Sequence, residues 1–138
     1  MTVREVCDAC FDAHQGDCSG FVKAVGAKRG VAIVGPADDI VVSLRSGGSW
    51  VALADGVAAE ASAAAGKFVV AGLKGQEQAV PNAHGHVVVV ADGELAHGNG
   101  PPAYWGSQGG TPGRDKTINW AWTAADRDRV SYAVWTAG

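Results

Sequence analysis

The sequence predicts an α+β fold, in which helices from the first half of the chain pack on one central antiparallel sheet built from the second half. Amphipathic helical patterns fill the first 65 residues. From Phe68 the character changes to short β-branched runs bounded by turn residues. Helices first and strands afterwards are typical of α+β folds.

Length and composition indicate one domain. The 138 residues, 47% of them hydrophobic, suffice for one real core and are too few for two comfortable domains. We therefore expect residues 1–138 to form a single domain. The net charge of −3, with the positive residues scattered, argues against a nucleic-acid partner.

The chain carries no pattern for membrane insertion or for a cleaved leader. Its N-terminus lacks a charged-then-apolar stretch, and no apolar run approaches the roughly 20 residues of a membrane span. We expect a protein made in the cytoplasm without a signal peptide and without membrane contact. Three cysteines are an odd count, so at least one thiol stays free, and we expect this to be Cys18.

The first predicted helix begins at Thr2, whose side chain can form a capping box with Glu5. Apolar residues then recur at helical spacing on one face: Val3, Val6, Cys7, Cys10 and Phe11. This helix is expected to end near Gly16 and to place Cys7 and Cys10 in the core.

Three more helices are expected before the sheet. One covers residues 18–27, one has Pro36 as its first residue and closes at Gly47–Gly48, and one covers residues 57–65. Residues 68–73 and 86–91 are expected to be central strands, buried on both faces. Later strand candidates are 103–105, 118–122 and 130–135, with Gly/Pro loops at 95–102 and 106–115.

The most informative residue is Cys18, which stands where a Gly/polar turn gives way to a helix. A thiol at a helix N-terminus feels the positive end of the macrodipole, and we expect this to lower its pKa and favour the nucleophilic thiolate. The alternative is a buried structural cysteine. The polar neighbours Asp17 and Ser19 favour catalysis.

The expected partner of Cys18 is His86, which opens a run of four valines. A histidine at the mouth of a buried strand can act as base and acid. It could instead be a satisfied histidine that caps a strand, and His84 is a rival that Gly85 and Asn82 place in the preceding loop. Cysteine on a helix start with histidine on a later strand is the layout of papain-like thiol hydrolases, which cut amide bonds through an acyl-thioester. His14 and His97 are expected to face solvent.

A zinc site competes for the same cysteine. Four residues have the spacing C-x2-C-x3-H-x3-C: Cys7, Cys10, His14 and Cys18. A zinc knuckle has longer gaps between its later ligands and carries basic and aromatic residues between them. Continuous helical periodicity through the first two cysteines also opposes the tight turn that a knuckle needs. A noncatalytic, zinc-organised binding module is therefore the less favoured alternative.

The segment from Gly16 to Val22 resembles the cysteine motif of NlpC-type cell-wall peptidases, which belong to the papain-like clan. Three further segments extend the likeness over nearly the whole chain: Ala71 to Gly75, Gly85-His86-Val87, and Asp126 to Arg129 before a final aromatic strand. Together they resemble type VI secretion amidase effectors. The resemblance implies an NlpC-type papain-like fold with N-terminal helices on a central antiparallel sheet.

The resemblance also implies site residues. Cys18 aligns with the family's nucleophile and His86 with its histidine, with the main-chain N–H of Cys18 among the oxyanion donors. A third group should orient the imidazole; the main-chain carbonyl of Trp105 would serve, and other side-chain candidates are Ser107, Gln108, Asn99 and His97. No metal or organic cofactor is required. Trp50 also matches, with a core role as the favoured interpretation.

Two departures from the family stand out. The stretch from Gln76 to His84 is longer than in the family and is expected to flank the active-site groove, where it would affect substrate preference. The family can tie its N-terminal helix to its C-terminus by a disulfide, but Cys7 has no late cysteine to meet, so we expect that staple to be absent.

The implied function is that of an antibacterial effector, delivered by a secretion apparatus into a rival's periplasm and neutralised in the producer by an immunity protein. Its substrate would be the peptidoglycan stem peptide, cut at the D-glutamyl–diaminopimelate bond. A thiol amidase for another murein linkage, such as the D-Ala–diaminopimelate cross-link, is the nearer alternative. We expect a monomer.

Overall fold

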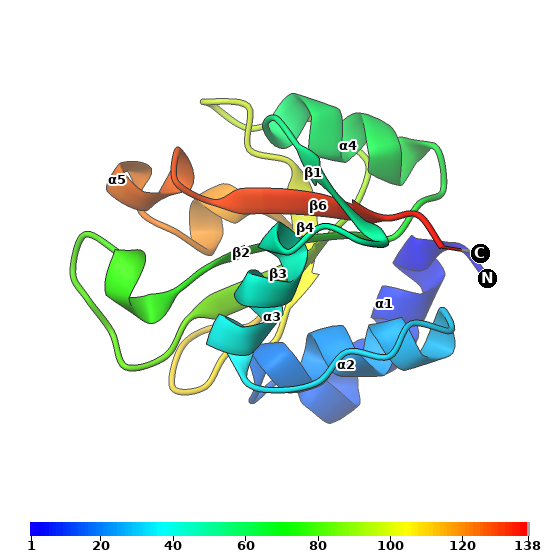
Figure 1. Ribbon diagram of the computed structural model, residues 1–138, viewed down its shortest axis with the longest axis horizontal. Coiled ribbons are helices and arrows are strands. Elements are labelled where there is room, and N and C mark those ends of the chain that lie inside the picture. Colours follow the sequence, from blue (N-terminus) through cyan, green and yellow to red (C-terminus); the bar gives the residue numbers. More distant parts are fainter. Residues whose placement is uncertain (138) are drawn as a thin grey trace.

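A six-stranded sheet forms the centre of the structure, and every strand pair in it is antiparallel (Figure 1). The computed structural model describes residues 1–137. Across the sheet the strands are β1 (Trp50–Leu53), β6 (Ser131–Trp135), β2 (Val69–Leu73), β3 (His86–Val90), β4 (Pro102–Trp105) and β5 (Gly113–Thr117). The α+β prediction is confirmed.

The two strands predicted to be central are central. β2 and β3 pair along their whole length, from Val69 opposite Val90 to Leu73 opposite His86. Every residue of β2 is buried, as is every residue of β3 except His86, which is partly buried. A strand covered on both faces needs apolar residues at every position, and that requirement explains the continuous valine run.

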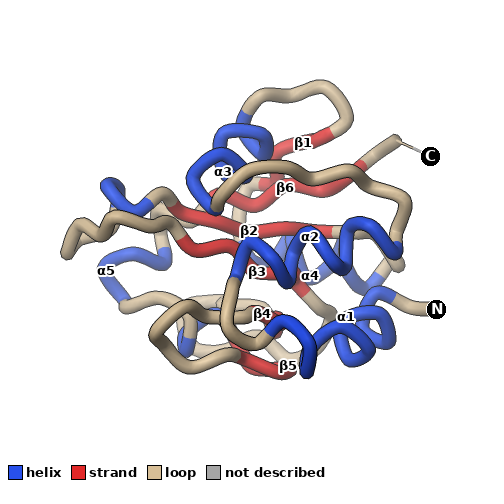
Figure 2. Tube along the Cα trace, turned by 90° about the horizontal axis from the view of Figure 1, so that it is seen from below, coloured by secondary structure: helices blue, strands red, loops and turns tan. Residues whose placement is uncertain are grey.

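Three helices cover one face of the sheet: α1 (Val3–Phe11), α2 (Cys18–Lys28) and α3 (Ala37–Arg45) (Figure 2). The capping box between Thr2 and Glu5 is present at the start of α1, and a 3₁₀ turn, η1 (Asp12–His14), follows that helix. Helix α3 begins one residue later than predicted, so Pro36 is its N-cap and not its first residue.

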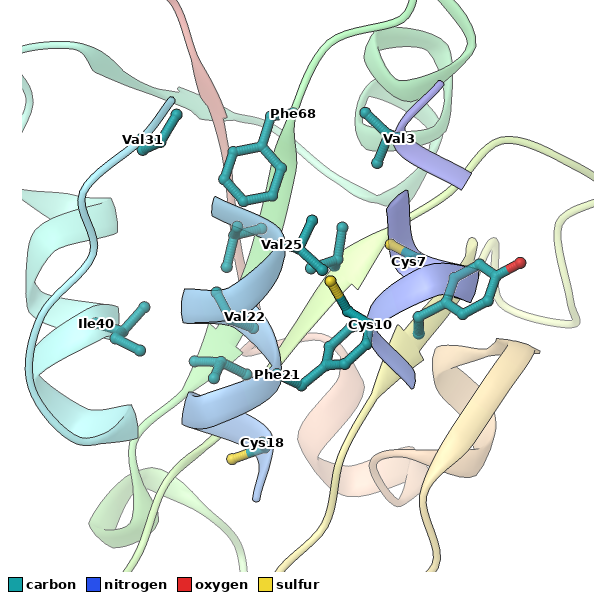
Figure 3. Close-up of a cluster of buried hydrophobic side chains, with 14 of the residues drawn as sticks. Val3, Cys7, Cys10, Cys18, Phe21, Val22, Val25, Val31, Ile40 and Phe68 are labelled. Atoms are coloured by element: carbon teal, nitrogen blue, oxygen red, sulfur yellow. The ribbon is translucent and has the colours of Figure 1, made fainter. Parts of the chain in front are cut away.

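The core on this face is built from the inward sides of these helices (Figure 3). Phe21, Val22 and Val25 of α2 are fully buried. Cys7 and Cys10 of α1 are buried in the same cluster, as predicted. Trp50 is also buried, against Phe68 and Trp135, which confirms its core role.

The opposite face is covered by α4 (Gly56–Ala64) and by the 3₁₀ turn η3 (Ile118–Trp120). The Asp55 side chain caps α4 by accepting from the N–H of Ala58. Ala59 and Ala63 point inward, and their small side chains let the helix approach the sheet closely. No helix within residues 1–137 has the length and apolar character needed to cross a membrane.

Several elements differ from the prediction. Residues 118–122 were predicted as a strand but form η3 and its exit, because the N–H groups of Ala121 and Trp122 both bond to the carbonyl of Ile118. Aromatic and β-branched composition alone does not separate such a turn from a strand. Part of the predicted loop 106–115 belongs to β5, an edge strand whose residues 114–116 are exposed and lack an apolar pattern.

Two further short elements were not predicted: β1, with four residues on the other edge of the sheet, and α5 (Ala124–Arg127). A third turn, η2 (Gly75–Glu77), begins the long segment between the central strands. Elements this short carry too few residues for a hydrophobic period to show.

Candidate active site

A groove of about 450 Å³ brings the two predicted catalytic residues to one place. Its walls come from residues 17–19, 36–37, 78–86, 105–111 and 120–126, and both Cys18 and His86 are among the lining residues. The groove lies where β3 begins, at the end of the sheet that also meets the start of α2.

The motif around Cys18 builds the start of α2. Asp17 is the N-cap, and its carboxylate accepts bonds from the Ser19 N–H at 3.1 Å and from the Ser19 hydroxyl at 2.9 Å. A Cβ at Gly20 would lie 2.9 Å from the same carboxylate, so glycine leaves room for the cap. Cys18 is thereby held as the first residue of the helix, where main-chain N–H groups have no partner within the helix.

The edge of β3 is open beside Cys18 because β4 leaves the sheet early. Val89 pairs with Tyr104 and Val90 with Ala103, and continuing this register would place Gly106 opposite Val87. The chain instead turns toward the residues before α2. The Ser107 N–H donates to the carbonyl of Gln15 at 2.8 Å.

Gly106 permits this departure. A Cβ there would lie 2.2 Å from the carbonyl oxygen of His14 and 2.6 Å from that of Asp17, so only glycine can approach so closely. The loop after β4 therefore packs against the turn that precedes Cys18.

The sulfur of Cys18 faces the edge of β3 that β4 leaves unpaired. Its thiol donates to the carbonyl of Gly85 over 3.9 Å, and the N–H of Val87 is directed at the sulfur. The Cys18 sulfur thus contacts main-chain groups of the residue before His86 and of the residue after it. Cys18 is only 8% exposed, and Figure 3 shows it in the first turn of α2.

The imidazole of His86 lies against aromatic rings. Its ring centroid is 5.3 Å from that of Trp122 and 6.2 Å from that of Trp105, both in edge-to-face geometry. These tryptophans belong to the core on the α4 face, whereas Cys18 belongs to the core on the α1–α3 face. Within residues 1–137 no hydrogen bond joins the Cys18 sulfur to the His86 ring.

Burial controls the electrostatics of both groups. It raises the pKa of the Cys18 thiol above its ordinary value and outweighs the Val87 N–H, which favours the thiolate. It lowers the pKa of His86 to about 4. The expectation of a lowered thiol pKa at the helix start was wrong, because loss of hydration exceeds the helix-terminus effect. Both shifts favour a neutral thiol and a neutral imidazole at pH 7.

The candidates for the third group divide into two sets. Trp105, Ser107 and Gln108 line the groove. His97 and Asn99 lie outside it: the carbonyl of His97 accepts from the Asn119 amide, and Asn99 packs against the start of α4. The role of any of these residues toward His86 stays a prediction.

The long segment between β2 and β3 flanks the groove, as expected. Gln78, Asn82 and His84 are lining residues. A carboxylate fixes this segment, since Asp126 of α5 accepts from the Ala79 N–H at 2.7 Å and pairs with Arg129 at 2.7 Å. Asp126 is buried, and this contact explains part of the acidic-basic motif before β6.

Trp120, Trp122 and Asp126 are among the groove residues that the sequence did not predict. Both tryptophans were assigned to the strand candidate 118–122, which forms a 3₁₀ turn and its exit. Asp126 stood out in the sequence only as the first residue of the acidic-basic segment Asp126 to Arg129.

The four residues whose spacing suggested zinc do not come together as a metal site. Cys7 and Cys10 point into the apolar core from α1, and all three cysteines are free thiols. Within residues 1–137 no three His, Cys, Asp or Glu side chains are grouped so that they could hold a metal ion.

Comparison with known proteins finds a similar peptidoglycan amidase. The chain is 38% identical over 127 residues to peptidoglycan amidase Tse1 of Pseudomonas aeruginosa, a match that covers 89% of this chain and 77% of that protein. No protein-family model matches. Identity of this size over most of both chains shows that the protein belongs to the family of type VI secretion amidase effectors.

Proposed function

We propose that the protein is a peptidoglycan amidase that cleaves stem peptides with Cys18 as nucleophile and His86 as general base. The similarity to a peptidoglycan amidase supports a hydrolase acting on peptidoglycan. The observation that carries the proposed mechanism is that one groove contains both a thiol at a helix start and an imidazole at the start of a strand.

The proposed reaction starts from the neutral pair. The His86 ring swings out from between Trp105 and Trp122, around the open edge of β3, and takes the thiol proton as the sulfur attacks the amide carbonyl carbon. The main-chain N–H of Cys18 donates to the oxyanion, and such a donor is typically worth about 3 kcal/mol of barrier. His86 then protonates the leaving amine, and water hydrolyses the thioester.

We propose the D-glutamyl–diaminopimelate bond as the bond that is cut, with action in the periplasm of a recipient cell. Delivery by a secretion apparatus and inhibition by an immunity protein that covers the groove complete this proposal. Its support is the family membership and the open groove around Cys18. Cleavage at another murein amide, such as the D-Ala–diaminopimelate cross-link, would give products of different mass.

Mass spectrometry of defined muropeptides tests both the reaction and the bond. Cys18→Ala should abolish cleavage and leave the fold intact, because alanine keeps the helix start and its Asp17 cap. Cys10→Ala is the matched control, since Cys10 is equally a buried cysteine but lies outside the groove. A Cys18→Ala protein that cuts at the normal rate would falsify the proposal.

Targeted expression tests the place of action. In a Gram-negative host, the wild-type protein should be tolerated in the cytosol and should cause lysis when an added signal directs it to the periplasm. The Cys18→Ala protein should be tolerated in both compartments. Equal tolerance of the wild-type protein in both would count against a cell-wall substrate.

A further inference from the structure

Trp120 projects from the rim of the groove. It is 75% exposed, although it stands between two buried residues of the same turn, Ile118 and Trp122. The turn is fixed by the carbonyl of Ile118, which accepts from the N–H groups of both Ala121 and Trp122. Anchoring of Ile118 and Trp122 in the core therefore holds Trp120 outward as a lining residue of the groove.

A lysine lies beside this indole. The Nζ atom of Lys116, from the edge strand β5, is 5.4 Å from the Trp120 ring centroid, a cation–π geometry. The contact restricts the ring while most of the side chain stays in solvent. The result is a flat apolar surface with hydrogen-bond donors next to it.

We propose that Trp120 and Lys116 form a platform for a sugar ring of the peptidoglycan glycan strand. A pyranose presents a face of C–H groups that can stack on an indole, and a rim of hydroxyl and acetamido groups that can accept from an ammonium. This inference rests on the proposed function, because the stem peptide in the groove is attached to that strand.

The position of the platform fits this ligand better than it fits a peptide side chain. Trp120 lines the same groove as Cys18 and His86 but stands at its exposed rim, where a chain attached to the bound peptide would leave the groove. Large rigid aromatic side chains lose little conformational entropy on binding, so one such residue can orient a substrate.

The test compares two substrates that differ only in the sugar: a disaccharide–tetrapeptide and the same tetrapeptide without its disaccharide. Trp120→Ala should lower the ratio of kcat/KM for the first substrate to that for the second by about fivefold. Trp120→Phe should restore most of this ratio, and Lys116→Ala should lower it by a smaller factor. Val51→Ala is the control, since Val51 is an exposed apolar residue on β1, the opposite edge of the sheet, and this variant should leave both rates unchanged.

Any other outcome contradicts the proposal that Trp120 and Lys116 bind a sugar ring. An equal loss on both substrates would mean that Trp120 contacts the stem peptide, and an unchanged ratio without loss would mean that it contacts neither part. Cleavage of the sugar-free peptide by wild-type protein tests the proposed function separately. If wild-type protein cleaves neither substrate, the proposed function is wrong and the platform falls with it.

Discussion

The two walls that carry the candidate catalytic groups are built differently. The thiol wall, residues 17–19, is polar and hydrogen-bonded: a side-chain cap fixes the helix start, and the sulfur meets main-chain groups of Gly85 and Val87. The aromatic wall, Trp105 and Trp122, holds the His86 imidazole by ring packing. The Cys18 thiol is thus held by directional bonds, whereas the His86 imidazole is held by edge-to-face ring contacts.

Burial favours the neutral form of both groups, although they are held in different ways. Both walls oppose charge, since burial raises the pKa of the thiol and lowers that of the imidazole. In the proposed mechanism the imidazole moves toward a sulfur that stays in place. Removal of a group from either wall should therefore have a distinct signature.

The largest effect is expected from the proposed general base. His86→Asn should lower kcat/KM by about 10³-fold, because proton transfer to and from the reacting atoms is lost. The control is His84→Asn, two residues earlier in the same groove wall, which should cost no more than about threefold. Steady-state kinetics on a defined muropeptide measures both. A larger loss from His84→Asn would give the role of base to the rival histidine.

The aromatic wall should also make stability depend on pH. In the unfolded chain His86 binds a proton near pH 6.5, but in the folded protein it stays neutral down to about pH 4. The unfolded state therefore binds more protons between these values, so stability is complete above pH 6.5 and falls as the pH drops toward 4. The shift corresponds to roughly 3 kcal/mol.

Denaturant unfolding of wild-type protein and His86→Asn across this pH window measures that contribution. The variant should show a flatter dependence, since asparagine does not titrate. Parallel pH profiles for the two proteins would mean that the folded imidazole titrates normally and that burial does not keep it neutral.

The sequence was sufficient to predict the secondary-structure element on which each candidate catalytic residue lies. Asp17, Ser19 and Gly20 signal a helix start, and the valine run after His86 signals a buried strand, so both residues could be placed on the correct elements. These are local patterns, and a local pattern is visible without the fold.

The sequence was not sufficient to predict what surrounds the two groups. The contact between Cys18 and the edge of β3 depends on β4 leaving the sheet at Gly106, a long-range event. The direction of the thiol pKa was missed for the same reason, because burial comes from tertiary packing while the helix terminus is read locally. The aromatic wall needed a turn at residues 118–120 that resembles a strand in composition.

A smaller effect is expected where α5 fixes the loop beside the aromatic wall. Asp126→Ala removes the acceptor of the Ala79 N–H and the partner of Arg129, which should cost about 1–3 kcal/mol of stability. The freed loop should raise KM more than it lowers kcat. Asp128→Ala, an exposed aspartate two residues along, is the control and should change neither quantity. An unchanged KM in Asp126→Ala would show that the loop does not contact the substrate.

The smallest effect separates the two tryptophans of the aromatic wall. The Trp105 indole N–H donates to the carbonyl of Thr111 at 3.1 Å, whereas the Trp122 N–H is buried and has no hydrogen-bond partner within residues 1–137. Phenylalanine at either position removes the same volume and keeps an aromatic ring near His86. Trp105→Phe should therefore cost about 1 kcal/mol more stability than Trp122→Phe, because only the first substitution breaks a bond. Equal losses in thermal or denaturant unfolding would mean that the Trp122 N–H is also bonded in solution, and His86 would then be held by a more directional wall than its ring contacts imply.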